Sequence, residues 1–133
     1  MDAIPKPTDA ELMILQVLWA EGPSTVRQIL GVLEKQRPTG YTTVLKLLQI
    51  MADKGLVTRD MSQRTHVYCA RNTESHTQTQ LIGELARRAF DGSSAKLAMQ
   101  ALSSRRASPE ELSELRDLLN ELEGRDKREG SAE

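Results

Sequence analysis

A Thr-Thr-x-x-Lys segment is the part of the chain whose residue types and spacing best suit contact with another molecule. If residues 41–54 form a helix, Thr42, Lys46 and Gln49 share one face and Thr43 flanks it. Lysine can donate hydrogen bonds to guanine or to a phosphate, and threonine can donate to a phosphate or contact a thymine methyl group. The pattern therefore predicts a face able to read the major groove of DNA. The alternative is an ordinary solvated helix face.

Basic residues are concentrated around this segment. The whole chain carries 18 basic and 19 acidic residues, but residues 35–71 contain seven basic residues and only two acidic ones. Such a local excess of positive charge favours an anionic partner. The residues expected to contact backbone phosphates are Lys35, Arg37, Arg59 and Arg64. The alternative is that the charges at the tip of a predicted hairpin serve only to keep the protein soluble.

Residues that can bind metals occur at three nearby positions, but their spacing is unfavourable. His66, Cys69 and His76 offer imidazole and thiolate groups, which suit zinc or copper. His66 and Cys69 are three residues apart in a predicted strand, so their side chains point to opposite faces. We therefore expect no metal site and no cofactor, and we interpret Cys69 as a small buried apolar residue.

Several classes of protein are excluded by motifs and composition. The sequence has no Gly-rich phosphate loop, no HExxH and no GxSxG, so an enzyme is not expected. It has one cysteine, no signal-peptide pattern at its start and no apolar run of the roughly 20 residues that cross a bilayer. We therefore expect a cytoplasmic protein without a membrane segment. Aromatic residues make up only 3%, which argues against binding single strands by stacking.

Local signals predict three helices followed by a β-hairpin in the first part of the chain. Thr8 and Glu11 form a capping-box pattern at the first helix, and Gly55 with Leu56 suits a Schellman ending for the third. The expected apolar face of the first helix contains Leu12, Leu15, Leu18 and Trp19. The predicted elements are helices at about 8–20, 25–36 and 41–54 and strands at about 56–61 and 66–71. This is the element order of a winged helix-turn-helix, whose third helix enters the major groove.

The second part of the chain is predicted to be helical at about 74–91, 94–104 and 109–123. These helices carry more apolar surface than so short a segment can bury alone, so we expect it to be covered by a second copy of the chain. The residues expected at this interface are Leu81, Leu85, Phe90, Leu97, Leu112, Leu115, Leu118, Leu119 and Leu122. The predicted organisation is a winged-helix domain at 1–72, a dimerisation region at 73–124 and a disordered tail at 125–133.

Four segments together resemble the penicillinase-repressor family of bacterial regulators, the BlaI/MecI type. They are ELMILQVLWAEGPSTVRQI, GYTTVLKLLQIMADKGLV, RTHVYCA and SPEELSELRDLLNEL, within residues 8–123. The resemblance implies a homodimer on a palindromic operator, with an N-terminal winged helix and three C-terminal dimerisation helices. It also implies that Thr42, Thr43 and Lys46 read DNA and that residues 62–65 form the wing.

The chain departs from the family at two positions of functional interest. Antibiotic-sensing members are cleaved at an Asn-Phe bond in the second helix of the dimerisation region, where this chain has Gln100-Ala101. Because that bond is absent here, the resemblance leaves open whether a regulatory protease is a partner of this chain. The copper-responsive members carry a Cys-x-Cys pair, and this chain has only Cys69, which excludes copper sensing by that route.

The sequence thus predicts a mainly α protein with a small β-wing that acts as a homodimeric, DNA-binding transcriptional repressor. In this interpretation the third helix lies in the major groove, and the wing contacts the phosphate backbone. The alternative is a winged helix that serves as a protein-interaction module without DNA, which the balanced net charge of −1 allows. The operator sequence, the regulated genes and the inducing signal are not encoded in these patterns.

Overall fold

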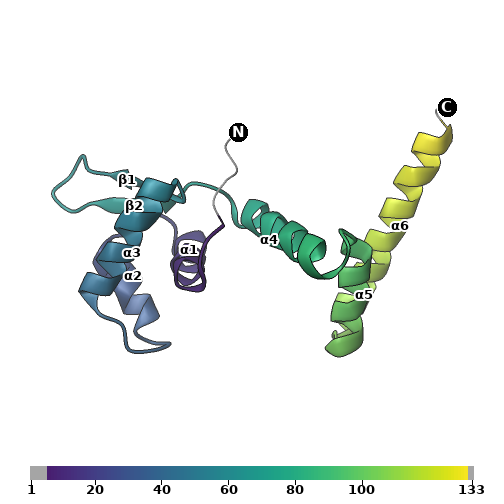
Figure 1. Cartoon of the computed structure of the whole chain (residues 1–133), viewed down its shortest axis with the longest axis horizontal. Coiled ribbons are helices and arrows are strands. Elements are labelled where there is room, and N and C mark those ends of the chain that lie inside the picture. The colour runs from purple at the N-terminus through teal and green to yellow at the C-terminus, as the bar shows by residue number, and fades with distance from the viewer. Residues whose placement is uncertain (1–5, 132–133) are drawn as a thin grey trace. The chain divides into compact units, whose positions relative to one another are not determined.

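The amino-terminal part of the chain is a three-helix unit with a β-hairpin, as predicted for a winged helix-turn-helix (Figure 1). The computed structural model describes residues 6–131. The elements of this part are α1 (Asp9–Glu21), α2 (Val26–Leu33), α3 (Tyr41–Lys54), β1 (Val57–Asp60) and β2 (Val67–Ala70). The two strands pair antiparallel, with Val57 opposite Ala70 and Asp60 opposite Val67. The predicted order of elements is confirmed, although α2 and both strands are shorter than expected.

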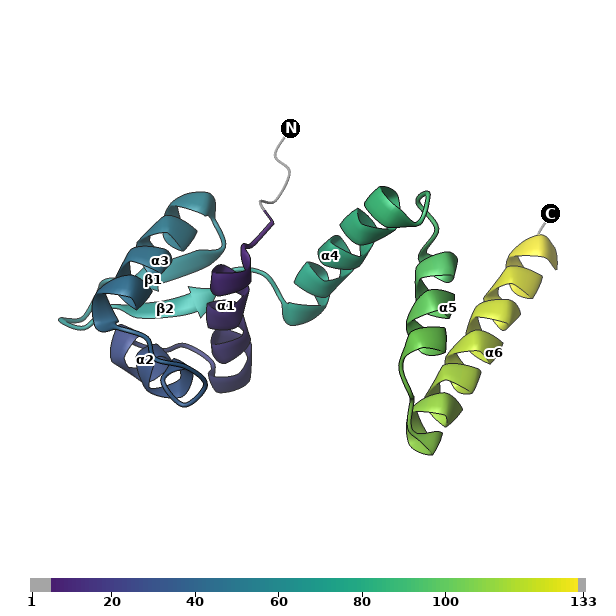
Figure 2. The ribbon, with the colours of Figure 1, turned by 60° about the horizontal axis from the view of Figure 1, so that its bottom comes forward.

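The core of this unit is built around α1. Ile14, Leu15, Val17 and Leu18 are all buried, because α1 packs against α2, α3 and β2 and so buries more than one face (Figure 2). The sequence analysis assigned this helix a single apolar face. Leu12, which was placed on that face, is only half-buried. Ile14 and Val17 lie outside the predicted face but are buried, because α1 packs against more than one element.

The ends of α1 and α3 follow their local sequence signals. The Thr8 hydroxyl accepts a hydrogen bond from the Glu11 amide at 3.2 Å, and a Glu11 carboxylate oxygen accepts one from the Thr8 amide at 2.9 Å. Gly55 has a φ of 84°, and the Leu56 amide donates to the Met51 carbonyl at 2.9 Å. The predicted capping box and Schellman ending are therefore both confirmed.

The remaining elements are helices α4 (Glu74–Ala89), α5 (Ser94–Ser104) and α6 (Pro109–Ser131). The chain divides into two compact units, Met1–Leu85 and Ala86–Glu133, so the division falls within α4. The sequence analysis placed a boundary between residues 72 and 73. In the first part of α4, Glu84 forms an ion pair of 2.6 Å with Lys6 of the amino-terminal unit.

Helix α6 continues well beyond its predicted end at residue 123. The prediction that residues 125–133 are disordered was wrong for residues 125–131, and residues 132–133 lie outside the described part of the chain. Gly124 follows the predicted end of the helix directly, but it does not adopt the positive φ that would end a helix there. A glycine inside a helix costs only about 1 kcal/mol. An ion pair of 2.6 Å between Arg125 and Glu121, one turn apart, supports the extension.

Candidate nucleic-acid interface

Helix α3 has a buried apolar face and an exposed polar face. Val44, Leu48 and Met51 are completely buried. Thr42, Thr43, Lys46 and Gln49, which the sequence analysis predicted as base-contacting residues, are all exposed. The buried face fixes the rotation of the helix about its axis, so the structure brings these four side chains to solvent together.

The C-terminal end of α3 is held by a buried ion pair that the sequence analysis missed. The Lys54 ammonium lies 3.0 Å and 2.9 Å from the two carboxylate oxygens of Glu11, which is only 1% exposed. Burial by itself raises the pKa of the Glu11 carboxyl group, but the Thr8 amide and the Lys54 ammonium lower the pKa below its ordinary value. Glu11 therefore caps α1 and anchors α3, although the sequence pattern indicated only the first role.

The wing is attached to the start of α2. The Ser24 amide donates to the Tyr68 carbonyl at 3.0 Å, and the Tyr68 amide donates to the Ser24 carbonyl at 2.8 Å. Ser24 directly precedes Thr25, whose hydroxyl caps α2 by accepting a hydrogen bond from the Gln28 amide at 3.2 Å. These backbone bonds fix the base of the wing relative to the helix-turn-helix.

The predicted phosphate-contacting residues are all exposed, but they lie in two places. Lys35 and Arg37 are in the connection between α2 and α3, whereas Arg59 and Arg64 belong to the hairpin. In the same hairpin Asp60 accepts a hydrogen bond of 2.9 Å from the Ser62 amide, and bonding to Ser62 lowers the pKa of the Asp60 carboxyl group.

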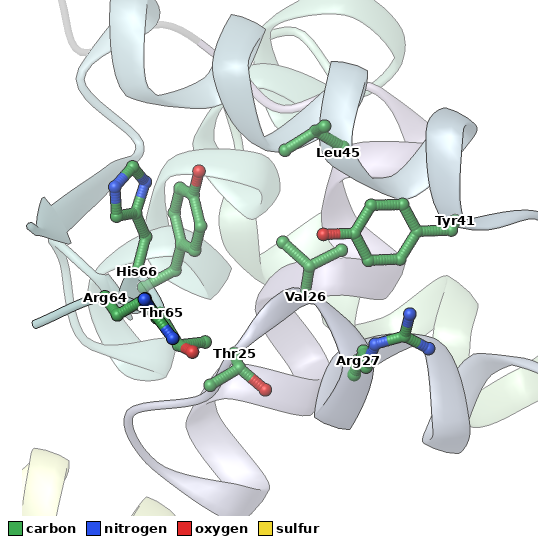
Figure 3. A pocket seen from close by; sticks show the side chains of 9 residues that line it. Thr25, Val26, Arg27, Tyr41, Leu45, Arg64, Thr65 and His66 are labelled. Atoms are coloured by element: carbon green, nitrogen blue, oxygen red, sulfur yellow. The ribbon is translucent and has the colours of Figure 1, made fainter.

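A surface hollow lies between α2, α3 and the wing (Figure 3). We call it the wing hollow. Its volume is about 320 Å³. Its lining residues are Thr25, Val26, Arg27, Tyr41, Leu45, Arg64, Thr65, His66 and Tyr68. Of the predicted DNA-contacting residues only Arg64 lines it, while Arg27 and Tyr41 were not predicted as site residues.

Arg27 and Tyr41 connect the two helices of the helix-turn-helix on one side of this hollow. The Arg27 guanidinium lies over the Tyr41 ring, 5.3 Å from its centre, which is the geometry of a cation–π contact. The two residues are far apart in sequence, so helix periodicity could not pair them.

The predicted dimerisation residues remain largely uncovered in the single chain. Leu85, Leu112, Leu118, Leu119 and Leu122 are between 40% and 57% exposed. Leu81, Phe90, Leu97 and Leu115 are half-buried. No residue of α5 is buried. The described part of these helices thus presents an apolar surface that the chain itself does not cover.

The predictions for a metal site, a membrane-spanning helix and the surroundings of Cys69 can also be compared with the described residues. Among residues 6–131 no group of three or more His, Cys, Asp or Glu side chains is placed to hold a metal ion. No helix in the described part of the chain is both long and apolar enough to span a membrane. Cys69 is half-buried, whereas the sequence analysis expected it to be buried, because it lies beside a surface hollow at Trp19 and Pro23.

Comparison with known proteins places this arrangement in a family. The family model for the penicillinase repressor matches residues 7–121. The chain belongs to the penicillinase repressor family. It is 32% identical over 116 residues to the transcriptional regulator BlaI of Mycobacterium tuberculosis, which covers 86% of this chain and 83% of that protein. It is 25% identical over 127 residues to the penicillinase repressor of Bacillus licheniformis, covering 96% and 99%.

Two solved structures are also similar to this chain. The DNA-binding domain of the repressor BlaI matches with a TM-score of 0.49 and 27% identity, over 56% of this chain and 92% of that domain. A transcriptional regulator from Thermotoga maritima matches with a TM-score of 0.47 and 24% identity, over 93% of this chain and 79% of that one.

The residues that carried the resemblance to the penicillinase repressor family have structural roles in this chain. Trp19 donates a hydrogen bond of 2.9 Å from its indole nitrogen to the Asn72 carbonyl, which joins α1 to the end of the hairpin. Tyr68 is 1% exposed and contributes to the core. The resemblance in sequence therefore reflects positions that determine the fold, and the family assignment predicted from them is confirmed.

Proposed function

We propose that this member of the penicillinase repressor family is a DNA-binding transcriptional repressor that acts as a homodimer on an operator with two-fold symmetry. The observation that carries the proposal is the exposed polar face of α3, which a completely buried opposite face holds in position. The two relatives, named as a transcriptional regulator and a penicillinase repressor, support regulation of transcription over catalysis. The site of action would be the cytoplasm, where the bacterial chromosome lies.

In this proposal the two kinds of contact have separate tasks. Thr42, Thr43, Lys46 and Gln49 would enter the major groove and contact base edges. Lys35, Arg37, Arg59 and Arg64 would neutralise backbone phosphates and thus supply affinity that does not depend on sequence. Two winged helices in one dimer would contact half-sites related by the same two-fold axis.

The homodimer is supported by the uncovered leucines of α4–α6. In water an apolar surface of this extent favours association, and a symmetric dimer is the simplest closed arrangement for one kind of chain. The region 73–124 is thus our proposed dimerisation region. Gln100 and Ala101 are exposed in α5, and a regulatory protease as an additional partner stays a prediction of the family resemblance.

Binding of duplex DNA by matched variants tests the proposal. Selection of genomic fragments by the wild-type protein would first supply a preferred duplex. Lys46→Ala should then weaken binding to that duplex by about 1–3 kcal/mol and relax its sequence preference. Arg64→Ala should weaken binding to all duplexes alike and reduce the salt slope by about one.

Arg106→Ala is a suitable control, because Arg106 is exposed in the connection between α5 and α6. The substitution removes the same charge as Arg64→Ala. Gel-shift titrations at several salt concentrations give both affinity and slope. A wild-type protein that binds no duplex, even at low salt, would contradict the proposal and favour the alternative of a protein-interaction module. Unchanged binding by both interface variants would remove the assigned roles.

A further inference from the structure

The wing hollow has the chemistry of a phosphate site. Its polar groups are the guanidinium groups of Arg27 and Arg64, the imidazole of His66 and the hydroxyl groups of Thr25, Tyr41, Thr65 and Tyr68. The lining residues that the structure describes include no acidic side chain. The hollow between α5 and α6 differs, because two glutamates line it. Positive charge with hydrogen-bond donors and without carboxylates selects an anion with several acceptor oxygens.

The walls of the wing hollow are joined to one another by contacts that do not need a ligand. Two backbone hydrogen bonds between Ser24 and Tyr68 join the wing to the start of α2. The cation–π contact between Arg27 and Tyr41 joins α2 to α3. The three walls are therefore linked to one another, and Arg27 already lies over Tyr41, so its side chain would lose less conformational entropy on binding than a free surface arginine.

The side chains face the hollow from opposite sides. Figure 3 shows Arg64 and His66 of the wing on one side and Tyr41 with Arg27 on the other, with the Tyr41 hydroxyl directed toward the middle. Val26 and Leu45 add apolar surface between them. Cationic and hydroxyl groups around an apolar floor suit a phosphodiester, because its charged oxygens are flanked by the apolar carbons of two sugars.

The location of the hollow indicates which phosphodiester would occupy it. In the proposed complex α3 lies in the major groove and the wing lies beside it. A sugar–phosphate backbone separates each major groove from the neighbouring minor groove. A strand that passes from α3 to the wing would therefore cross the space between these two elements, and residues of both line the wing hollow.

We propose that the wing hollow binds one backbone phosphate of the bound DNA, with Arg27 and the Tyr41 hydroxyl on the helix side and Arg64 and His66 on the wing side. This inference rests on the proposed function and extends it to Arg27, Tyr41 and His66. A phosphate held between α2, α3 and the wing would fix the position of the DNA relative to α3, so these residues position the helix and carry no base preference.

The test measures the binding of a duplex of arbitrary sequence at several salt concentrations by fluorescence anisotropy. Arg27→Gln should weaken binding about tenfold and reduce the magnitude of the salt slope by about one, since one fewer phosphate is neutralised. Arg27→Lys, which retains the charge, should restore the slope. Tyr41→Phe retains the ring beneath Arg27 and should weaken binding about threefold without changing the slope, because a neutral donor releases no counterion.

Arg106→Gln is the matched control, because it removes the same charge from an exposed position outside the hollow. If the wild type binds duplex and Arg27→Gln has the same affinity and slope as Arg106→Gln, the phosphate site is refuted while the proposed function stands. If the wild type binds no duplex at low salt, both fail. Thermal denaturation of every variant shows that it is folded.

A second arm separates DNA from a free phosphorylated ligand. Inorganic phosphate is titrated into wild type and Arg27→Gln and followed by calorimetry. Weak binding, in the millimolar range or beyond, agrees with a site that needs the rest of the duplex. Tight phosphate binding that Arg27→Gln abolishes, together with unchanged duplex binding, would assign the hollow to a free phosphorylated molecule and overturn the proposal.

Discussion

Replacing Lys54 by methionine should destabilise the amino-terminal unit much more than replacing Glu11 by glutamine. The Glu11 side chain is 2% exposed and the Lys54 side chain is 35% exposed, so the two partners of the ion pair depend on each other unequally. Lys54→Met leaves the buried Glu11 carboxylate with the hydrogen bond from the Thr8 amide but without its cation. Glu11→Gln leaves an ammonium group that can turn toward water.

The magnitude follows from this asymmetry. Removing one partner of a fully buried ion pair costs about 3–5 kcal/mol, and the partial exposure of Lys54 reduces this to about 2–3 kcal/mol. Glu11→Gln can still accept the hydrogen bond from the Thr8 amide, and it should cost about 1 kcal/mol. For a chain of this length the Lys54→Met variant should therefore unfold about 10 °C below the wild type.

The stability of the two proteins should also depend differently on pH. In the wild type the pKa of Glu11 is lowered, so its contribution to stability is present above the ordinary carboxyl pKa and is lost as the pH falls through the folded-state pKa. In Lys54→Met the ammonium group no longer lowers the pKa of Glu11, and we expect burial, the largest single influence on this carboxyl group, to raise the pKa above its unfolded value. Protonation then relieves the buried charge, and the variant should become more stable as the pH falls from 7 to 5.

Urea denaturation of wild type, both single variants and the double variant, at one fixed protein concentration and at pH 5 and 7, measures these effects. The double variant should be more stable than Lys54→Met, because it removes the uncompensated charge. Equal destabilisation by the two single variants, or a Lys54→Met variant that loses stability toward pH 5, would refute the reasoning.

Three further outcomes are expected. Trp19→Phe should lower the free energy of unfolding by about 1 kcal/mol, because it loses the hydrogen bond to the Asn72 carbonyl but retains an aromatic ring; an unchanged thermal midpoint would contradict this role. Gly55→Ala should cost about 1–2 kcal/mol in urea denaturation, because φ is +84° and the added methyl group would lie 3.4 Å from the Arg71 guanidinium. Leu119→Glu, at a side chain 57% exposed, should leave the helical content of dilute protein unchanged but shift sedimentation toward the monomer; an unaffected dimer would argue against the proposed interface.

Much of the fold was predictable because its signals are local. The capping box at Thr8 and the Schellman ending at Gly55 each involve residues within one turn of the helix end, and both are present in the structure. The change of periodicity after Gly55 likewise indicated the hairpin. Such features depend on neighbouring residues alone, so their physical chemistry can be evaluated from the sequence without knowing the packing.

The features missed by the sequence analysis depend on residues far apart in the chain. The pairs Glu11 with Lys54, Arg27 with Tyr41 and Ser24 with Tyr68 form only when three helices and the hairpin have packed. Their residue types are common on protein surfaces, so no pattern in the sequence singled them out. The exposed face of α3 was predicted because a buried stripe determines its opposite side, whereas the wing hollow needs three elements at once.

The uncovered leucines of α4 and α6 make the stability of the molecule depend on its concentration in the cell. If those side chains are buried only between two copies, mass action stabilises the folded helices as the protein accumulates and withdraws that support on dilution. Occupancy of a two-fold symmetric DNA site would then depend on roughly the square of the monomer concentration wherever most chains are monomeric. Modest changes in synthesis or degradation would thus switch repression more sharply than they would for a protein that binds as a single chain.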